Sequence, residues 1–187
     1  SLDVKWGSGA FMKTREDAEA LARSLVAVGN GAGVQTRARI TDMNQPLGLT
    51  VGNAIEVEEA VACLKGEGPE DPASLTCDLI GDPRAREVLD SGAAYAHWCR
   101  MVEAQGGDPA APLLGEGCTE AVVASPRSGV IERCDAYEIG RAAFVLGAGR
   151  LRAKDPVHFG VGVRVHAKVG DRVEAGQPLV TLLHDEA

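Results

Sequence analysis

The sequence is poor in aromatic residues, in positive charge and in long apolar runs, and each shortage excludes something. Phe, Trp and Tyr make up only 4% of the 187 residues, so the core must be built mainly from Ala, Val, Leu and Ile. The formal net charge is −8 and no basic stripe occurs, which argues against a nucleic-acid partner. No apolar run approaches the ~18 residues that span a bilayer, so we expect no membrane partner.

Cysteine and histidine are present without the spacing of a known metal or catalytic motif. The five cysteines are odd in number and no two form a C-x-x-C pair, so we expect small buried residues with free thiols, as in a reducing cytoplasm. The histidines lie far apart and accompany neither a G-x-S-x-G nor an H-E-x-x-H motif. Surface or core roles are therefore favoured for all four: His97, His158, His166 and His184.

The first third of the chain alternates between strand and helix patterns. Residues 2–6 read as a strand, Thr14 can cap an amphipathic helix, and residues 34–40 alternate as a second strand. Strand, helix and strand in this order predict a parallel pair with a crossover helix. The Gly7-Ser8-Gly9 turn and the loop 42–48 would then both leave the carboxyl ends of strands, where α/β sheets bind ligands.

The rest of the chain changes from helical to β-rich patterns. Residues 74–101 have a patchy helical pattern. Short β-like runs follow at 119–124, 129–133, 161–165, 172–173 and 179–183, with one helical insertion near 136–146. We therefore expect an α/β fold in three parts. Residues 1–108 would hold part of a mixed sheet flanked by helices, residues 109–117 a linker, and residues 118–187 a small β-rich module resembling a barrel-sandwich.

Two local patterns have both a structural and a functional interpretation. The Gly7-Ser8-Gly9 turn could expose backbone N–H groups to an anion, although such a turn is more often only a turn and neither phosphate-loop fingerprint is present. Glu56, Glu58 and Glu59 lie at the start of a helix predicted from 56 to 64. They either interact with the helix dipole, or one of them binds a cation together with carbonyls of the preceding loop.

Two segments resemble biotinyl and lipoyl carrier domains: residues 169–179 resemble the closing hairpin and residues 126–130 the opening strand. Lys168 precedes that hairpin within a His-Ala-Lys-Val run, whereas a carrier lysine occupies a tight turn, so a purely structural module is favoured. The alternative function is a non-catalytic binding or assembly chain with this carrier-like module. An exposed sheet edge beside residues 2–5 would favour an enzyme over that alternative.

Six motifs in a fixed order resemble the thymidine and pyrimidine-nucleoside phosphorylases. They are distributed along the chain up to residue 150, and the closing β module resembles the C-terminal domain of that family. The motifs are D-V-K-W-G-S-G-A-F-M (3–12), T-D-M-N-Q-P-L-G (41–48), G-N-A-I-E-V (52–57), L-K-G-E-G-P (64–69), A-Q-G-G-D (104–108) and L-G-A-G-R (146–150).

This resemblance implies phosphorolysis of a pyrimidine nucleoside to the free base and (deoxy)ribose 1-phosphate by a homodimeric, cytoplasmic pentosyltransferase. Phe11 would border the base pocket. A monovalent cation, K⁺ or Na⁺, would be bound by the carbonyls of Leu47 and Thr50 and the carboxylate of Glu59. No organic cofactor is implied.

The resemblance also implies what these residues do not supply. In the family, the phosphate-binding loop, the catalytic histidine and the base-reading Arg, Ser and Lys come before the matching segments. We therefore assign no catalytic residue and expect this chain to be the later portion of a longer enzyme. The family also has additional helical residues at the position between Asp82 and Pro83, so we expect a shortened segment there.

Overall fold

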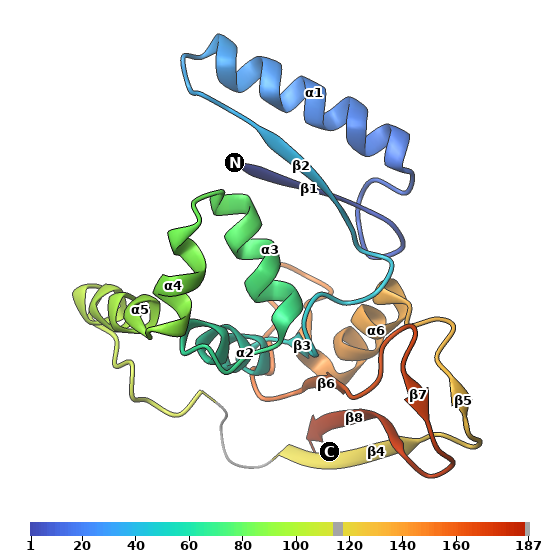
Figure 1. Ribbon diagram of the computed structural model, residues 1–187. Helices are drawn as coiled ribbons and strands as arrows, with labels where there is room; N and C mark the ends of the chain where they lie inside the picture. Colours follow the sequence, from blue (N-terminus) through green and yellow to red (C-terminus); the bar gives the residue numbers. More distant parts are fainter. Residues whose placement is uncertain (114–117, 186–187) are drawn as a thin grey trace.

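A parallel two-stranded sheet covered by one helix forms the first part of the computed structural model, which describes residues 1–113 and 118–185. Strands β1 (Leu2–Trp6) and β2 (Ala38–Asp42) pair in parallel, and α1 (Arg15–Gly31) lies along one face of the pair (Figure 1). The predicted parallel pair is confirmed. Strand β2 begins later than the alternation suggested, because the amide of Thr36 donates to Asn30 and its hydroxyl to the carbonyl of Val34.

The start and the packing of α1 follow from its sequence. Thr14 is the N-cap, as predicted, and its hydroxyl accepts a hydrogen bond from the amide of Asp17 at 3.2 Å. Ala18 and Ala22 are buried against Val4 of β1, and Trp6 packs against the same cluster. Small alanines let the helix approach the strands closely, while Trp6 supplies bulk in a chain that has few aromatic residues.

Four helices follow the strand β3 (Thr50–Gly52) and occupy the predicted helical region. The helices are α2 (Ala54–Leu64), α3 (Glu70–Ile80), α4 (Arg84–Asp90) and α5 (Ala93–Ala104). Helix α3 ends at Gly81, which adopts a left-handed conformation with φ of 68°. The carboxylate of Asp82 accepts the amide of Arg84, so the junction predicted to be shortened forms a tight α3–α4 turn.

The C-terminal part is β-rich, as predicted, but its described residues do not close into a barrel. An antiparallel sheet has the order β3-β6-β8-β4, and a separate hairpin-like pair joins β5 to β7. The expected barrel-sandwich is therefore not confirmed. The strands of this part are β4 (Cys118–Ala124), β5 (Gly129–Val130), β6 (Gly162–Val165), β7 (Arg172–Val173) and β8 (Pro178–Asp185). Between β5 and β6 lies the helix α6 (Ala136–Ala143), which passes into a π-type turn (Phe144–Ala148).

Strand β3 was not predicted, and it connects the two halves of the chain. Thr50, Val51 and Gly52 pair with Arg164, Val163 and Gly162 in the antiparallel ladder. The four-stranded sheet therefore contains one strand from before the predicted linker at 109–117 and three from after it. Residues 114–117 of that linker lie outside the described residues.

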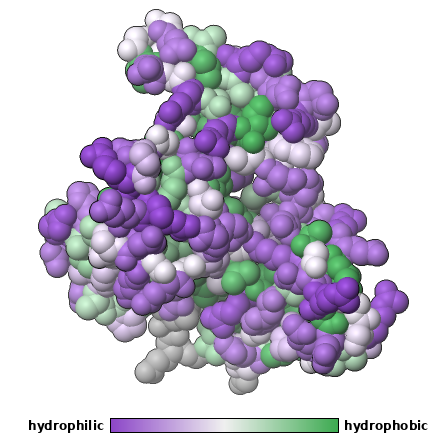
Figure 2. All heavy atoms as spheres, viewed as in Figure 1, coloured by the Kyte–Doolittle hydropathy of each residue, from purple (hydrophilic) through white to green (hydrophobic). Residues whose placement is uncertain are grey.

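The larger core lies between this sheet and α6. Val163, Val165 and Ala143 are buried there, and half-buried Val51 and Leu182 pack against them. Figure 2 shows a mostly hydrophilic surface on the viewed face, with apolar residues gathered beside α1 and near the C-terminal strands. The core is aliphatic, as the shortage of aromatic residues predicted.

Two expectations from composition concern membranes and thiols. Across residues 1–113 and 118–185, no helix is both long enough and apolar enough to cross a membrane. All five cysteines are free thiols, but they are half-buried and not fully buried as expected. Burial is nevertheless sufficient to raise the pKa of the Cys63 and Cys134 thiols.

Replacing Val163 by Ala tests the importance of the aliphatic core. The side chain of Val163 has no exposed surface, so removal of two methyl groups should lower the free energy of unfolding by about 2 kcal/mol. Urea unfolding followed by circular dichroism measures the change. Val145→Ala is the matched control, because Val145 is 79% exposed and its loss should change stability by less than about 0.5 kcal/mol. Equal effects of the two substitutions would contradict the assignment of the core.

Candidate functional site

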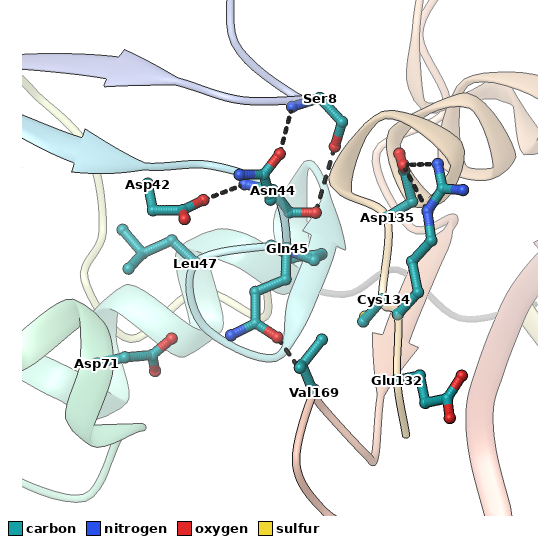
Figure 3. Close-up of a pocket in the computed structure, with 12 residues that line it drawn as sticks. Ser8, Asp42, Asn44, Gln45, Leu47, Asp71, Glu132, Cys134, Asp135 and Val169 are labelled. Carbon is teal, nitrogen blue, oxygen red and sulfur yellow. Dashed lines mark hydrogen bonds and ion pairs between the residues drawn. The ribbon is translucent and has the colours of Figure 1, made fainter. Parts of the chain in front are cut away.

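A cleft of about 730 Å³ lies where the carboxyl ends of β1 and β2 meet the C-terminal part of the chain. One wall comes from the turn after β1 and the loop 42–47 after β2, with Asp71 of α3 beside them. The other wall comes from residues 132–135 and Val169 (Figure 3). Ligand-binding loops were predicted at these strand ends, and the structure brings both loops to one cleft.

Asn44 holds the two strand-end loops together. Its side-chain oxygen accepts the amide of Ser8 at 3.1 Å, and its carbonyl oxygen accepts the Ser8 hydroxyl at 3.2 Å. The Asn44 amide in turn donates to the carboxylate of Asp42 at 2.6 Å (Figure 3). The amides of all three turn residues are thus engaged by protein oxygens, because Gly7 also donates to the carbonyl of Met12 and Gly9 to that of Met43. This favours the structural interpretation of the turn over an anion site.

The opposite wall is fixed by the start of α6. Asp135 accepts the amides of Tyr137 and Glu138 as the helix N-cap and forms an ion pair with Arg133. The bond from the Arg133 guanidinium, together with that from the Glu138 amide, lowers the pKa of Asp135, so this carboxyl remains ionised near neutral pH. The carbonyl of Asn44 accepts the amide of Ala136 at 3.0 Å and joins the two walls.

Phe11, the predicted base-pocket residue, follows the turn after β1 and presents its ring to solvent. Its side chain is 98% exposed, the highest value among the large apolar residues of the described chain. Phe11 does not line the cleft. An exposed aromatic side chain of this kind is available to stack against a planar ring.

Glu59 of α2 reaches back to the loop that precedes β3. One carboxylate oxygen accepts the amide of Leu49 at 2.7 Å. The other lies so close to Gly48 that a Cβ there would be 1.9 Å away, and Gly48 has φ of 72°. Burial raises the pKa of Glu59, although the bond from Leu49 partly opposes this. The structure therefore places the carboxylate of Glu59 against Gly48 and Leu49, which lie between the two residues whose carbonyls were predicted as ligands, Leu47 and Thr50.

The donor set at this loop suits a hard monovalent cation. It consists of one carboxylate and neighbouring backbone carbonyls, which are the oxygen ligands that such ions prefer. Among residues 1–113 and 118–185, no hydrogen bond ends on the carbonyl oxygen of Leu47. No three His, Cys, Asp or Glu side chains of these residues gather as ligands for a metal ion. A second carboxylate beside the loop, that of Asp71, is already paired with Lys168, so the charge of Glu59 is the one left for a monovalent ion. Glu56 is engaged otherwise, because it accepts the amide of Gly52 at 2.8 Å.

Lys168 is placed against α3 and is not presented as a carrier lysine would be. Its ammonium forms an ion pair with Asp71 at 2.6 Å and its side chain is only 16% exposed. Asp71 also accepts the amide of Gly48 at 2.9 Å. Burial acts to raise the pKa of Asp71, but the bonds from Lys168 and Gly48 outweigh it and hold the pKa below its ordinary value. This geometry supports the structural interpretation of the module.

The C-terminal part of the chain matches a known protein family. Residues 130–187 match the model of the pyrimidine nucleoside phosphorylase C-terminal domain. This range includes β6, β7 and β8, the helix α6 and one wall of the cleft.

Nearly the whole chain is similar to individual curated proteins. The pyrimidine-nucleoside phosphorylase of Bacillus subtilis (strain 168) is 44% identical over 200 aligned positions, which include 97% of this chain and 46% of that protein. The enzyme of the same name from Staphylococcus aureus (strain bovine RF122 / ET3-1) is 41% identical with the same coverage. The resemblance inferred from the six motifs is therefore confirmed: nearly the whole chain is similar to part of the pyrimidine-nucleoside phosphorylases.

The chain spans a little less than half the length of these relatives. The 200 aligned positions exceed the 187 residues of the chain, so the relatives have residues that are lacking here. The alignment lengths agree with a shortened segment, and its position at Asp82–Pro83 stays a prediction.

The sequence did not predict the roles that Asn44, Asp71 and Lys168 have in this site. Asn44 could have been found, because Asn and Asp shortly after a strand often bond to nearby backbone. Asp71 carries no such signal, since an acidic residue in the first turn of a helix is ordinary. The pairing of Lys168 with Asp71 joins residues 97 positions apart.

Gly48→Ala tests the contact between the loop and Glu59. An added methyl group would meet the Glu59 carboxylate in a backbone conformation that L residues disfavour, so the substitution should lower the free energy of unfolding by about 1–3 kcal/mol. Urea unfolding measures it. Gly140→Ala in α6 is the control, since nothing lies within 4 Å of a Cβ there and the helix should be stabilised by up to about 1 kcal/mol. A neutral Gly48→Ala would contradict the close contact.

Asp71→Asn tests the lowered pKa of Asp71 through the pH dependence of stability. A carboxyl with a lowered pKa in the folded state adds stability above its unfolded pKa of about 3.9, and this contribution is lost as the pH falls through the folded pKa. The unaltered chain should therefore be more stable than Asp71→Asn at pH 7, by at most about 1 kcal/mol because the side chain is 44% exposed.

The difference should shrink below about pH 4, as measured by urea unfolding at a series of pH values. Asp78→Asn is the comparison, because it removes an exposed ion pair with Arg39. A stability difference for Asp71→Asn that is constant from pH 7 to pH 3 would show that the ionised carboxylate is not responsible.

Proposed function

We propose that this chain is part of a pentosyltransferase that cleaves pyrimidine (deoxy)nucleosides, thymidine or uridine, with phosphate. The observation that carries the proposal is the exposed ring of Phe11, which follows the turn after a parallel strand in a chain 44% identical to a pyrimidine-nucleoside phosphorylase. The products would be the free base and (2-deoxy)ribose 1-phosphate.

In this reaction an oxygen of phosphate forms a bond to the anomeric carbon of the sugar, and the bond from that carbon to the pyrimidine nitrogen breaks. The electron pair of the broken bond passes to the base, so the enzyme must stabilise negative charge on the pyrimidine and hold both substrates in line. The role proposed here for Phe11 is to contact the flat face of the base and orient it. The catalytic groups would come from an additional portion, namely the part of the relatives' length that this chain does not cover.

The free edge of β1 supports this function over a self-sufficient binding chain. In the described part of the structure, β1 forms its ladder with β2, a single bridge pairs Trp6 with Met12, and no further strand pairs with the second edge of β1 along residues 2–5. A sheet that continues on this side would set Phe11 between the described residues and the additional portion.

The proposed enzyme binds K⁺ or Na⁺ through the carbonyls of Leu47 and Thr50 and the carboxylate of Glu59. The ion would supply positive charge that holds this loop in one conformation, and Glu59 would compensate the charge of the ion. Glu59 already bonds to the amide of Leu49, which supports this assignment. A homodimer in the cytoplasm is part of the same proposal and rests on the family resemblance.

Phe11→Ala tests the proposed base contact in phosphorolysis assays with thymidine and uridine. Loss of the stacking surface should raise the KM for nucleoside roughly tenfold, equivalent to about 1.4 kcal/mol, with little change in the KM for phosphate. The melting temperature should stay the same because the side chain is almost fully exposed.

Phe159→Ala serves as the control, since Phe159 is also an exposed phenylalanine, at 68%, and lies in the C-terminal part of the chain. It should leave both KM values unchanged. If Phe11→Ala left the nucleoside KM unchanged in an active enzyme, the base contact would be refuted. If the longer enzyme, which joins these residues to the additional portion, cleaved neither nucleoside in the presence of phosphate, the proposed function would fail.

A further inference from the structure

Three charged side chains from three different elements meet at the Gly48 loop. Glu59 comes from α2, Asp71 from the first turn of α3, and Lys168 from the segment between β6 and β7. The carboxylates of Glu59 and Asp71 accept hydrogen bonds from the consecutive amides of Leu49 and Gly48, respectively. The loop is therefore held by two carboxylates. One of them, that of Asp71, forms an ion pair with the ammonium of Lys168.

The geometry makes Asp71 the link between Lys168 and the loop. A single oxygen of Asp71 accepts both the Gly48 amide at 2.9 Å and the Lys168 ammonium at 2.6 Å. Without the ammonium, Asp71 would face the like charge of Glu59 with no compensation, and repulsion would draw it away from Gly48. The Gly48 amide would then lose its acceptor, and the neighbouring carbonyl of Leu47 would lose its fixed direction.

The segment around Lys168 is itself rigidly placed. The amide of Lys168 donates to Asp171 at 2.8 Å, and the next amide, from Val169, donates to the side chain of Gln45 at 3.1 Å. The amide of Val165 donates to the carbonyl of Leu49 at 2.7 Å. These bonds fix the backbone of the C-terminal module on the loop from both sides, so the ammonium of Lys168 is delivered to one position.

We propose that Lys168 is a positioning residue for the cation loop: through Asp71 it holds Gly48, and with it the carbonyl of Leu47, in the arrangement that binds K⁺. This inference rests on the cation site of the proposed function. It adds a residue of the C-terminal module, between 109 and 121 positions away from the proposed ligands Glu59, Thr50 and Leu47, to the determinants of cation affinity.

The test is the K⁺ dependence of thermal stability in the full chain. KCl replaces tetramethylammonium chloride at constant total salt, and the rise in melting temperature gives the half-saturating K⁺ concentration. Lys168→Met should raise this concentration about fivefold or more, a coupling within the range found between linked sites. Lys168→Arg, which keeps the charge, should restore most of the affinity. In an Asp71→Ala background, Lys168→Met should have no further effect, because the link is already absent.

Lys5→Met is the matched control. Lys5 is similarly half-buried and pairs with Asp3 at 2.8 Å, but it lies on β1 and not at the loop. Its loss should lower the melting temperature without changing the half-saturating K⁺ concentration. This separates a general loss of stability from a loss of cation affinity.

Three results would overturn the proposal. If Lys168→Met lowered the melting temperature but left the half-saturating K⁺ concentration unchanged, Lys168 would be only a structural tether. If K⁺ bound more tightly to that variant, the ammonium would oppose the cation. If the unaltered chain showed no K⁺-specific stabilisation, both the cation site and the role of Lys168 would fail. Phosphorolysis measured on the longer enzyme that includes the additional portion reports separately on the proposed activity.

Discussion

The antiparallel pairing of β3 with β6 is the constraint on which the rest of the structure depends. It has only three residue pairs, yet it joins the strand before α2 to the central sheet of the C-terminal module. Gly52 and Gly162 are paired in its register. A Cβ on Gly52 would lie 2.8 Å from the carbonyl oxygen of Val161, directly before β6, and a Cβ on Gly162 would lie 2.6 Å from that of Val51 in β3. The two backbones can approach this closely because neither residue carries a side chain. The Gly48 loop lies directly before β3, so this ladder also fixes the loop against the module.

Local patterns predicted much of the fold. The cap at Thr14, the parallel pair of β1 and β2, and the short strands after residue 118 each follow from a signal confined to a few neighbouring residues. Consecutive motifs also carried the family resemblance, because matching short segments in order needs no knowledge of their contacts. The position of Glu59 against the loop was implied by that resemblance, and the structure places the two in contact.

The remaining features depend on contacts that no local pattern encodes. Strand β3 has three residues, too few for an alternation to be visible, and it exists because β6 supplies its partner. The strand predicted from Val34 lost its first residues to side-chain bonds of Asn30 and Thr36. The barrel-sandwich expectation came from analogy with carrier domains, whereas the described strands form one open sheet and a separate pair. Asp71 and Lys168 are ordinary surface residues in sequence until their pairing is seen.

The contacts between the two walls of the cleft determine which parts of the protein can fold while it is still being synthesised. Lys168 and Asp71 are separated by 97 positions, and Val169 and Gln45 by 124. During synthesis from the N-terminus, β1, α1 and β2 can associate while the last quarter of the chain is still being translated, since their contacts are local. The cleft and the Gly48 loop cannot take their final arrangement before residues 162–171 have been made. Until these emerge, the Gly48 loop has two acidic neighbours and no ammonium, so the contacts seen at this loop cannot be complete before Lys168 has been made.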